Sequence, residues 1–142
     1  MSTKMILLIG AVVIVVLGAI LIATPKPDGD NVFPPFASEN VKVSSPLPNA
    51  TVAQNFTVSG YARGIWFFEA SFPVEVRDPQ NNLVGIGIAQ AVGEWMTEEF
   101  VAFNAPVTVQ SYTGPATLVL KKDNPSGLPE HNDSESFSIV IQ

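Results

Sequence analysis

The chain has 142 residues, a net charge of −6 and no cysteine. The length allows one ordinary domain and an additional segment. The negative charge argues against nucleic-acid binding, because contacts with phosphates require clustered lysines and arginines. The lack of cysteine excludes disulfides, thiolate zinc sites and a cysteine nucleophile, so a domain outside the cytosol would be held together by its core alone.

Residues 1–23 are expected to form an N-terminal membrane anchor. Met5–Ala23 contains no charged residue, and its nineteen residues would span about 28 Å as a helix, close to the hydrocarbon thickness of a bilayer. A cleaved signal peptide is the alternative, but its apolar region usually has only about 7–15 residues. Leu21 is also too large for the position three residues before a cut after Ala23. We therefore expect a retained transmembrane helix over residues 5–23.

The charges that flank this helix predict its orientation. Lys4 precedes the helix without any acidic neighbour, whereas Lys26 on the other side is balanced by Asp28 and Asp30. Positive charge tends to remain in the cytoplasm. We expect a single-pass protein with a cytoplasmic N-terminus and a domain at the cell surface or in the periplasm.

Residues 24–40 are expected to form a linker, because they contain four prolines and no strand pattern. Pro-rich linkers are extended and semi-rigid. Phe33 and Phe36 are exceptions, since apolar rings suit neither a linker nor water. They are expected to contact the domain or the lipid headgroups.

The remaining residues, 41–142, show the period of two that is typical of strands. Phe72, Val74 and Val76 alternate with polar or small residues, so each run has one face suited to burial. Asp78–Asn82 is rich in turn-forming residues and is expected to close a hairpin. The expected strands are 41–43, 56–61, 72–77, 83–92, 100–103, 107–111, 118–121 and 136–141. This pattern predicts an all-β, immunoglobulin-like β-sandwich of seven to eight strands, preceded by one N-terminal transmembrane helix.

Three segments carry a resemblance to a known family: VSGYARGIWFFEASFPVEVRD (58–78), GEWMTEEFVAF (93–103) and KKDNPSGLPEHNDSESFSIVI (121–141). Together they resemble the immunoglobulin-like domain of bacterial spore germination proteins, the Gmad type, over 41–142. The resemblance implies the sandwich fold, an extracytoplasmic compartment, occurrence on short membrane-anchored proteins and no established catalytic activity.

Arg63 and Glu69 flank the aromatic stretch that contains Trp66, and a charge buried among aromatic rings requires a partner. We expect an ion pair between Arg63 and Glu69, and the alternative is that Arg63 binds a carboxylate or phosphate of a ligand. Trp66 and Trp95 are expected either in the core or exposed as a stacking surface for a sugar. Arg63, Trp66, Glu69 and Trp95 are therefore the candidate binding residues.

The loop 122–133 carries closely spaced oxygen ligands, including Asp123, Glu130 and Asp133, which suit a calcium ion. The spacing does not follow the EF-hand, and two prolines limit how the loop can wrap an ion. A solvated loop held by Asp and Asn caps is the favoured interpretation. No metal or other cofactor is expected.

Enzymatic signals are weak in this sequence. His131 is the only histidine, and no G-x-S-x-G nucleophile elbow occurs. Glu94, Glu98 and Glu99 would serve glycoside cleavage only if two carboxylates faced each other in a cleft. We therefore expect a non-catalytic interaction or scaffolding module with an envelope protein or glycan as its partner. The alternatives are a carbohydrate- or peptidoglycan-binding module with an exposed tryptophan, and self-association through an uncovered strand edge.

Overall fold

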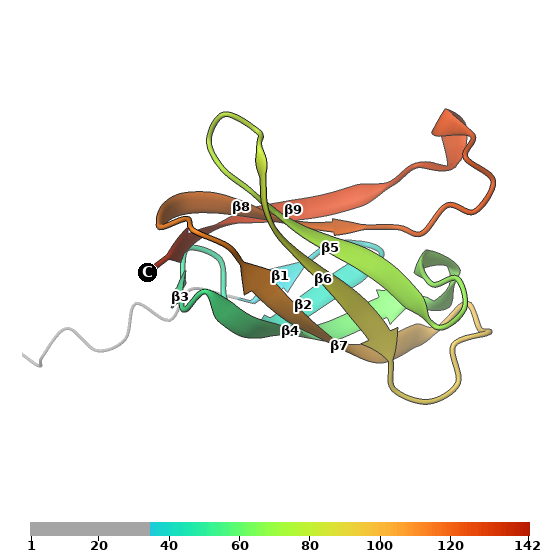
Figure 1. The fold of residues 1–142 in the computed structure, drawn as a ribbon. Coiled ribbons are helices and arrows are strands. Elements are labelled where there is room, and N and C mark those ends of the chain that lie inside the picture. Colours follow the sequence, from blue (N-terminus) through green and yellow to red (C-terminus); the bar gives the residue numbers. More distant parts are fainter. Residues whose placement is uncertain (1–34) are drawn as a thin grey trace, which may run out of the picture. The chain divides into compact units, whose positions relative to one another are not determined.

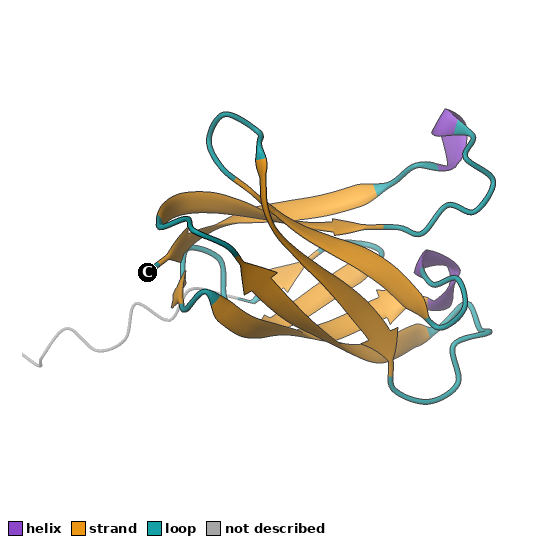
Figure 2. Cartoon of the chain, in the orientation of Figure 1, coloured by secondary structure: helices purple, strands orange, loops and turns teal. Residues whose placement is uncertain are grey.

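The computed structural model describes residues 35–142, and these residues are all-β (Figures 1 and 2). Seven strands have five residues or more, which confirms the predicted immunoglobulin-like sandwich, and two further strands have two residues each. The elements in chain order are β1 (Phe36–Ala37), β2 (Val41–Ser45), β3 (Thr51–Val52), β4 (Asn55–Arg63), η1 (Gly64–Trp66), β5 (Ser71–Arg77), β6 (Leu83–Ala91), β7 (Phe100–Val109), β8 (Gly114–Lys121), η2 (Pro129–His131) and β9 (Ser134–Ile141).

The strands pair in the order β1-β2-β4-β7-β6-β5-β8-β9-β3. Figure 1 shows β2, β4 and β7 in one layer and β5, β8 and β9 in the other. β6 pairs with both β5 and β7 and so connects the two layers along one side. Within the segment 41–52, β2 pairs with β4 in one layer, and β3 pairs in parallel with β9 in the other.

The alternating pattern places one side of each strand in a single core between the layers. On β5, Phe72, Val74 and Val76 are at most 1% exposed, whereas the residues between them are half-buried on the outer face. The ring of Phe72 meets the rings of Trp66, Phe67 and Phe103 edge-on, at centroid distances of 5.9, 5.1 and 5.0 Å. This aromatic cluster joins the residues after β4 to the centre of the domain, because such edge-on pairs add to the stability gained by burial.

The folded part begins before Val41. Phe36 lies in β1, which pairs with β2, and its ring stacks on that of Phe137 at 5.1 Å. Phe36 therefore contacts the domain, which was one of its two expected environments. The expected linker 24–40 is wrong at its C-terminal end, because residues 36–37 form a strand of the domain.

The two runs expected at 100–103 and 107–111 are parts of one strand, β7. Pro106 lies inside this strand, although proline cannot donate a ladder hydrogen bond. The pairing of β7 with β4 is continuous and includes the pair Thr57↔Pro106. On the other side of β7, residues 105 and 106 have no partner on β6, although Asn104 and Val107 on either side of them do. The missing donor therefore interrupts only one of the two ladders.

The predicted membrane anchor, residues 1–23, and the linker as far as residue 34 lie outside the described residues. Within residues 35–142, no helix has the length and apolar character needed to cross a membrane.

Candidate functional site

Three loops that contain the candidate binding residues and metal ligands meet at one end of the sandwich. We call this the loop end and define it as residues 38–40, 64–70, 92–99 and 122–133; Figure 1 shows η1, η2 and the loop 92–99 together there. Main-chain hydrogen bonds join the loops: the Gly64 amide donates to the Glu99 carbonyl, and the Asp123 amide donates to the Trp66 carbonyl, both at 3.0 Å. The Arg63 amide donates to the Asn40 carbonyl at 2.9 Å. Segments far apart in the sequence therefore form one surface.

Gly64 allows the loop 92–99 to lie directly against η1. A Cβ atom at this position would lie 1.8 Å from the Thr97 carbonyl oxygen and 2.5 Å from that of Trp95. Both neighbours are main-chain atoms, which cannot move aside as a flexible side chain would. A residue without a side chain is therefore required here, which explains the glycine after β4.

The expected ion pair between Arg63 and Glu69 is wrong. The Arg63 guanidinium carbon lies 4.0 Å from the centroid of the Phe100 ring, and Nη1 is 4.0 Å from Glu99 Oε2. The cause is the register, because Arg63 on β4 lies directly opposite Phe100 on β7. Glu69 has a positive φ of 49° and an exposed side chain, and it forms no ion pair with any residue of the described range. Arg63 therefore belongs to the loop end through Phe100 and Glu99.

The two tryptophans differ in exposure. Trp66 is 0% exposed, and its Nε1 has no hydrogen-bond partner within residues 35–142. Trp95 is half-buried and packs against the core. Trp66 is thus a structural anchor of the loop end and offers no surface for a sugar, whereas part of Trp95 remains exposed. Phe67 and Phe68, which follow Trp66, point to opposite sides, at 5% and 43% exposure, as the alternation of a strand requires.

The loop 122–133 is held by side-chain hydrogen bonds, but these come from Asn124 and Ser126 and differ from the expected Asp and Asn caps on main-chain amides. Asn124 Nδ2 donates to the Leu128 carbonyl at 2.8 Å and to Asn132 Oδ1 at 2.9 Å, and the Leu128 amide donates to Ser126 Oγ at 3.2 Å. Asp123, Glu130 and Asp133 were the candidate metal ligands. Across residues 35–142, no three His, Cys, Asp or Glu side chains are placed to hold a metal ion. The loop therefore owes its shape to Asn124 and Ser126.

The loop end carries most of the carboxylates of the described chain. Its segments contain eight carboxylates and one lysine, a net charge of −7 with His131 neutral, whereas the other described residues contain three carboxylates and four cations, a net charge of +1. The same loops expose large apolar side chains. These are Ile65 (55% exposed), Phe68 (43%), Val92 (57%), Met96 (74%) and Leu128 (48%).

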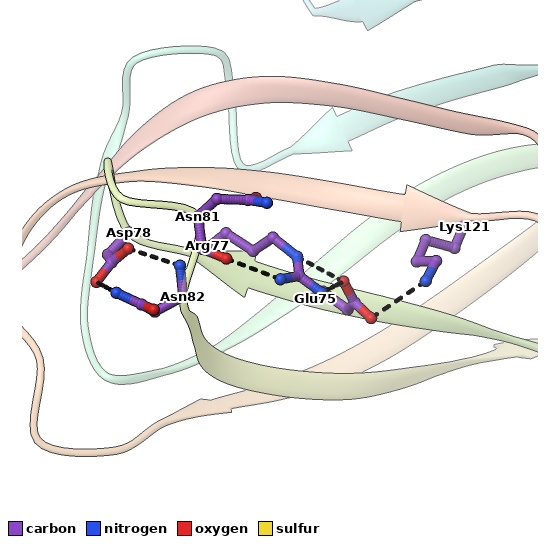
Figure 3. A network of polar contacts seen from close by, with 6 residues as sticks. All are labelled: Glu75, Arg77, Asp78, Asn81, Asn82 and Lys121. Atoms are coloured by element: carbon purple, nitrogen blue, oxygen red, sulfur yellow. Dashed lines mark hydrogen bonds and ion pairs between the residues drawn. The ribbon is translucent and has the colours of Figure 1, made fainter.

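A second polar feature lies on the outer face of β5 and β8 (Figure 3). Glu75 Oε2 lies 2.7 Å from Arg77 Nη2, and Glu75 Oε1 lies 3.4 Å from Lys121 Nζ. Arg77 Nη1 also donates to the Asn81 carbonyl at 2.9 Å, which ties β5 to its own hairpin. The three ionic side chains satisfy one another, so this network stabilises the sheet and leaves little charge for a ligand.

The hairpin beyond this network is closed by Asp78, as its sequence predicted. The Asn82 and Gln80 amides donate to Asp78 Oδ1 at 2.8 and 3.0 Å, and Asn82 Nδ2 donates to Asp78 Oδ2 at 3.0 Å (Figure 3). These hydrogen bonds, those from Asn82 foremost, lower the pKa of the Asp78 carboxyl below its ordinary value, because they favour the ionised form.

The sandwich and its loop arrangement agree with the comparison of the sequence with known families. Residues 40–127 match the immunoglobulin-like domain of bacterial spore germination. The chain belongs to this family. The match runs from the start of β2 into the loop before β9. It includes residue 40, the segments 64–70 and 92–99 and residues 122–127 of the loop end, but not η2. No curated protein and no solved structure matches the chain.

The match confirms the resemblance for the segments 58–78 and 93–103, and it covers residues 121–127 of the third segment. Domains of this family are generally non-enzymatic.

Proposed function

We propose that this chain is a non-catalytic, membrane-tethered module that presents its immunoglobulin-like domain outside the cytoplasm and binds a protein of the cell envelope through the loop end. The observation that carries the proposal is the convergence of three loops that expose five large apolar side chains. Immunoglobulin-type domains usually bind through loops that a rigid sandwich holds in place.

The chemistry of the loop end indicates the kind of partner. Exposed apolar side chains such as Met96 and Ile65 supply the contacts that lose water on binding. The surrounding carboxylates favour a partner that presents lysines or arginines around an apolar centre, since complementary charge speeds association and rejects other partners. Only Glu99, among the loop-end carboxylates, lies in an ion pair within the described range, so the others are available for a partner.

The first described strand runs away from the binding loops. The Asn40 carbonyl accepts a hydrogen bond from the Arg63 amide at the loop end, and residues 37 and 36 then lie opposite Lys42 and Val43 in β1, progressively farther from the loop end. Residues 35–37 therefore leave the loop end uncovered.

Crosslinking in intact cells tests the proposal. A photo-reactive amino acid replaces Met96 in the full chain, and a matched variant carries it at Leu83, which is 50% exposed and lies at the far end of β6. We expect a discrete crosslinked envelope protein from position 96, none from position 83, and loss of the product when Ile65→Asp is added. Equal products from both positions would contradict binding at the loop end.

Protease treatment of the same cells tests the compartment separately. We expect digestion of the domain on cells with a permeable or absent outer membrane. Complete protection, with digestion only after lysis, would contradict an extracytoplasmic domain.

A further inference from the structure

Two cationic side chains from neighbouring strands converge on one aromatic ring. Lys42 Nζ on β2 lies 4.4 Å from the centroid of the Phe100 ring, and Arg63 Cζ on β4 lies 4.0 Å from the same centroid. Because β2 and β4 are on the same side of β7 in the sheet, both side chains reach the ring from one direction. We propose that Lys42 and Arg63 bind a single carboxylate, and that this carboxylate is an acidic side chain of the loop-end partner; the second part rests on the proposed function.

The strand register places this cation pair on the outer face of the sandwich. Lys42 lies opposite Tyr61 in the pairing of β2 with β4, and Arg63 lies opposite Phe100 in the pairing of β4 with β7. Ala62, between Tyr61 and Arg63, is buried in the core, so its two neighbours point outward. Tyr61 is 50% exposed, and its hydroxyl adds a hydrogen-bond donor beside the two cations. A ligand from solvent therefore has access to the pair.

Neither cation is neutralised within the part of the chain that the structure describes. The Lys42 ammonium forms no ion pair there, and Arg63 forms only the one with Glu99, at 4.0 Å. The Glu99 side chain is 85% exposed, and an exposed ion pair of this length contributes little. The Phe100 ring attracts both cations but carries no charge. The two positive charges therefore repel each other, and an anion that contacts both would remove this repulsion.

The opposite layer shows which anion fits such a pair. There, an arginine and a lysine on neighbouring strands share one carboxylate: Glu75 Oε2 lies 2.7 Å from Arg77 Nη2, and Glu75 Oε1 lies 3.4 Å from Lys121 Nζ (Figure 3). Lys42 and Arg63 repeat this composition without the central carboxylate. The two oxygens of a carboxylate accept from an ammonium and a guanidinium at once, and its planar shape matches the guanidinium fork.

The charge of the surroundings favours a carboxylate over a phosphate. Lys42, Arg63 and Glu99 together have a net charge of +1, which one carboxylate neutralises. The loop end, which borders the pair, has a net charge of −7. A phosphate monoester carries about −2 at neutral pH, so the loop end repels it more strongly than it repels a carboxylate.

The position of the pair connects it with the proposed partner. Arg63 directly precedes Gly64 of the loop end, and Phe100 directly follows Glu99. A protein that covers the loop end with a standard footprint of roughly 800 Å² extends over these neighbours as well. Covering a cation costs free energy unless the partner supplies an anion. The partner is therefore expected to present an acidic side chain at one margin of its basic surface, which fixes the orientation in which it binds.

Titration of the full chain in a zwitterionic detergent tests the carboxylate site without the partner. The probe is N-acetylglutamate α-methylamide, which carries one carboxylate, and the NMR signal of the Arg63 Nε–H group reports its binding. We expect saturable binding that Lys42→Gln weakens about tenfold, because a charged hydrogen bond is lost. Lys121→Gln changes the net charge equally and should leave binding unchanged. Binding that does not saturate, equal weakening in both variants, or tighter binding of inorganic phosphate would overturn the site.

The crosslink from position 96 tests the occupant. We expect Lys42→Gln and Arg63→Gln each to lower its yield about tenfold, and Lys121→Gln to leave it unchanged. Lys42 is exposed, so its substitution keeps the fold, and an unchanged melting temperature confirms this. A wild-type crosslink that both variants retain would overturn this inference but not the proposed function. No crosslink from the wild type would contradict the proposed function, and the titration then decides the carboxylate site alone.

Discussion

The two ends of the sandwich use their polar groups in different ways. On the side of the β5–β6 hairpin, Asp78 accepts hydrogen bonds from Asn82, and Glu75 pairs with Arg77 and Lys121 (Figure 3). At the loop end, the loops are joined by main-chain hydrogen bonds and by the buried Trp66, while most carboxylates and five large apolar side chains face outward.

This difference separates the part of the molecule that stabilises the fold from the part available for binding. Side chains that satisfy one another gain little from a partner, because binding would first have to break their contacts. The loop end keeps its shape through main-chain atoms and the core, so its exposed side chains remain free for recognition. Three substitutions test this separation.

The largest effect is expected from Trp66→Ala, which removes the anchor of the loop end. Trp66 is fully buried against Phe72, so its truncation should lower the free energy of unfolding by about 3–5 kcal/mol. Denaturant unfolding followed by fluorescence measures the loss. The control is Trp95→Ala, where the ring is only half-buried, and the loss should be clearly smaller. Equal losses would show that the two loops are anchored alike.

An intermediate effect is expected from Glu75→Gln at the other end. The change removes the charge that Arg77 and Lys121 share, and their side chains are 28% and 45% exposed, so solvent compensates part of the loss. We expect the free energy of unfolding to fall by about 1–2 kcal/mol, less so in high salt. Glu130→Gln on η2 is the matched control, because Glu130 is exposed and should tolerate the change. A Glu75→Gln variant as stable as the control would mean that the network does not stabilise the sheet.

The smallest effect is expected from Asp78→Asn, and it should depend on pH. The pKa of Asp78 is lowered in the folded state, so the ionised carboxylate contributes stability above the ordinary value of 3.8 and loses this contribution as the pH falls through the folded-state pKa. The wild type should therefore melt slightly above the variant at neutral pH. The two melting curves should converge in acid below pH 3.8. A difference that stays constant from neutral pH to strong acid would refute this account of the hairpin.

The sequence revealed the strands and the hairpin because alternation and turn residues are local signals. Phe72, Val74 and Val76 are buried as their spacing indicated, and Asp78 caps the turn as its neighbours suggested. Contacts between side chains on neighbouring strands could not be predicted in this way, because they depend on the strand register, which a single sequence does not reveal. Arg63 therefore faces Phe100, which is distant in sequence, and not Glu69, which is near.

The meeting of the three loops at one end was also beyond the sequence. Each loop was recognisable by its composition, but the end it occupies depends on the direction of the strand before it and on the pairing order. Gly64 was a local signal of this arrangement, because a glycine beside an aromatic run indicates that another segment of the chain approaches closely.

The uneven distribution of charge gives the domain a strong electric dipole along its length, with −7 at one end and about +1 over the rest. In physiological salt a field decays over about 8 Å, which is short compared with strands about 30 Å long. An anionic surface would therefore interact only with the end of the domain that lies within about 8 Å of it. It would repel the acidic end but not the other end. Rotation beside such a surface would be biased toward an upright orientation without any specific contact.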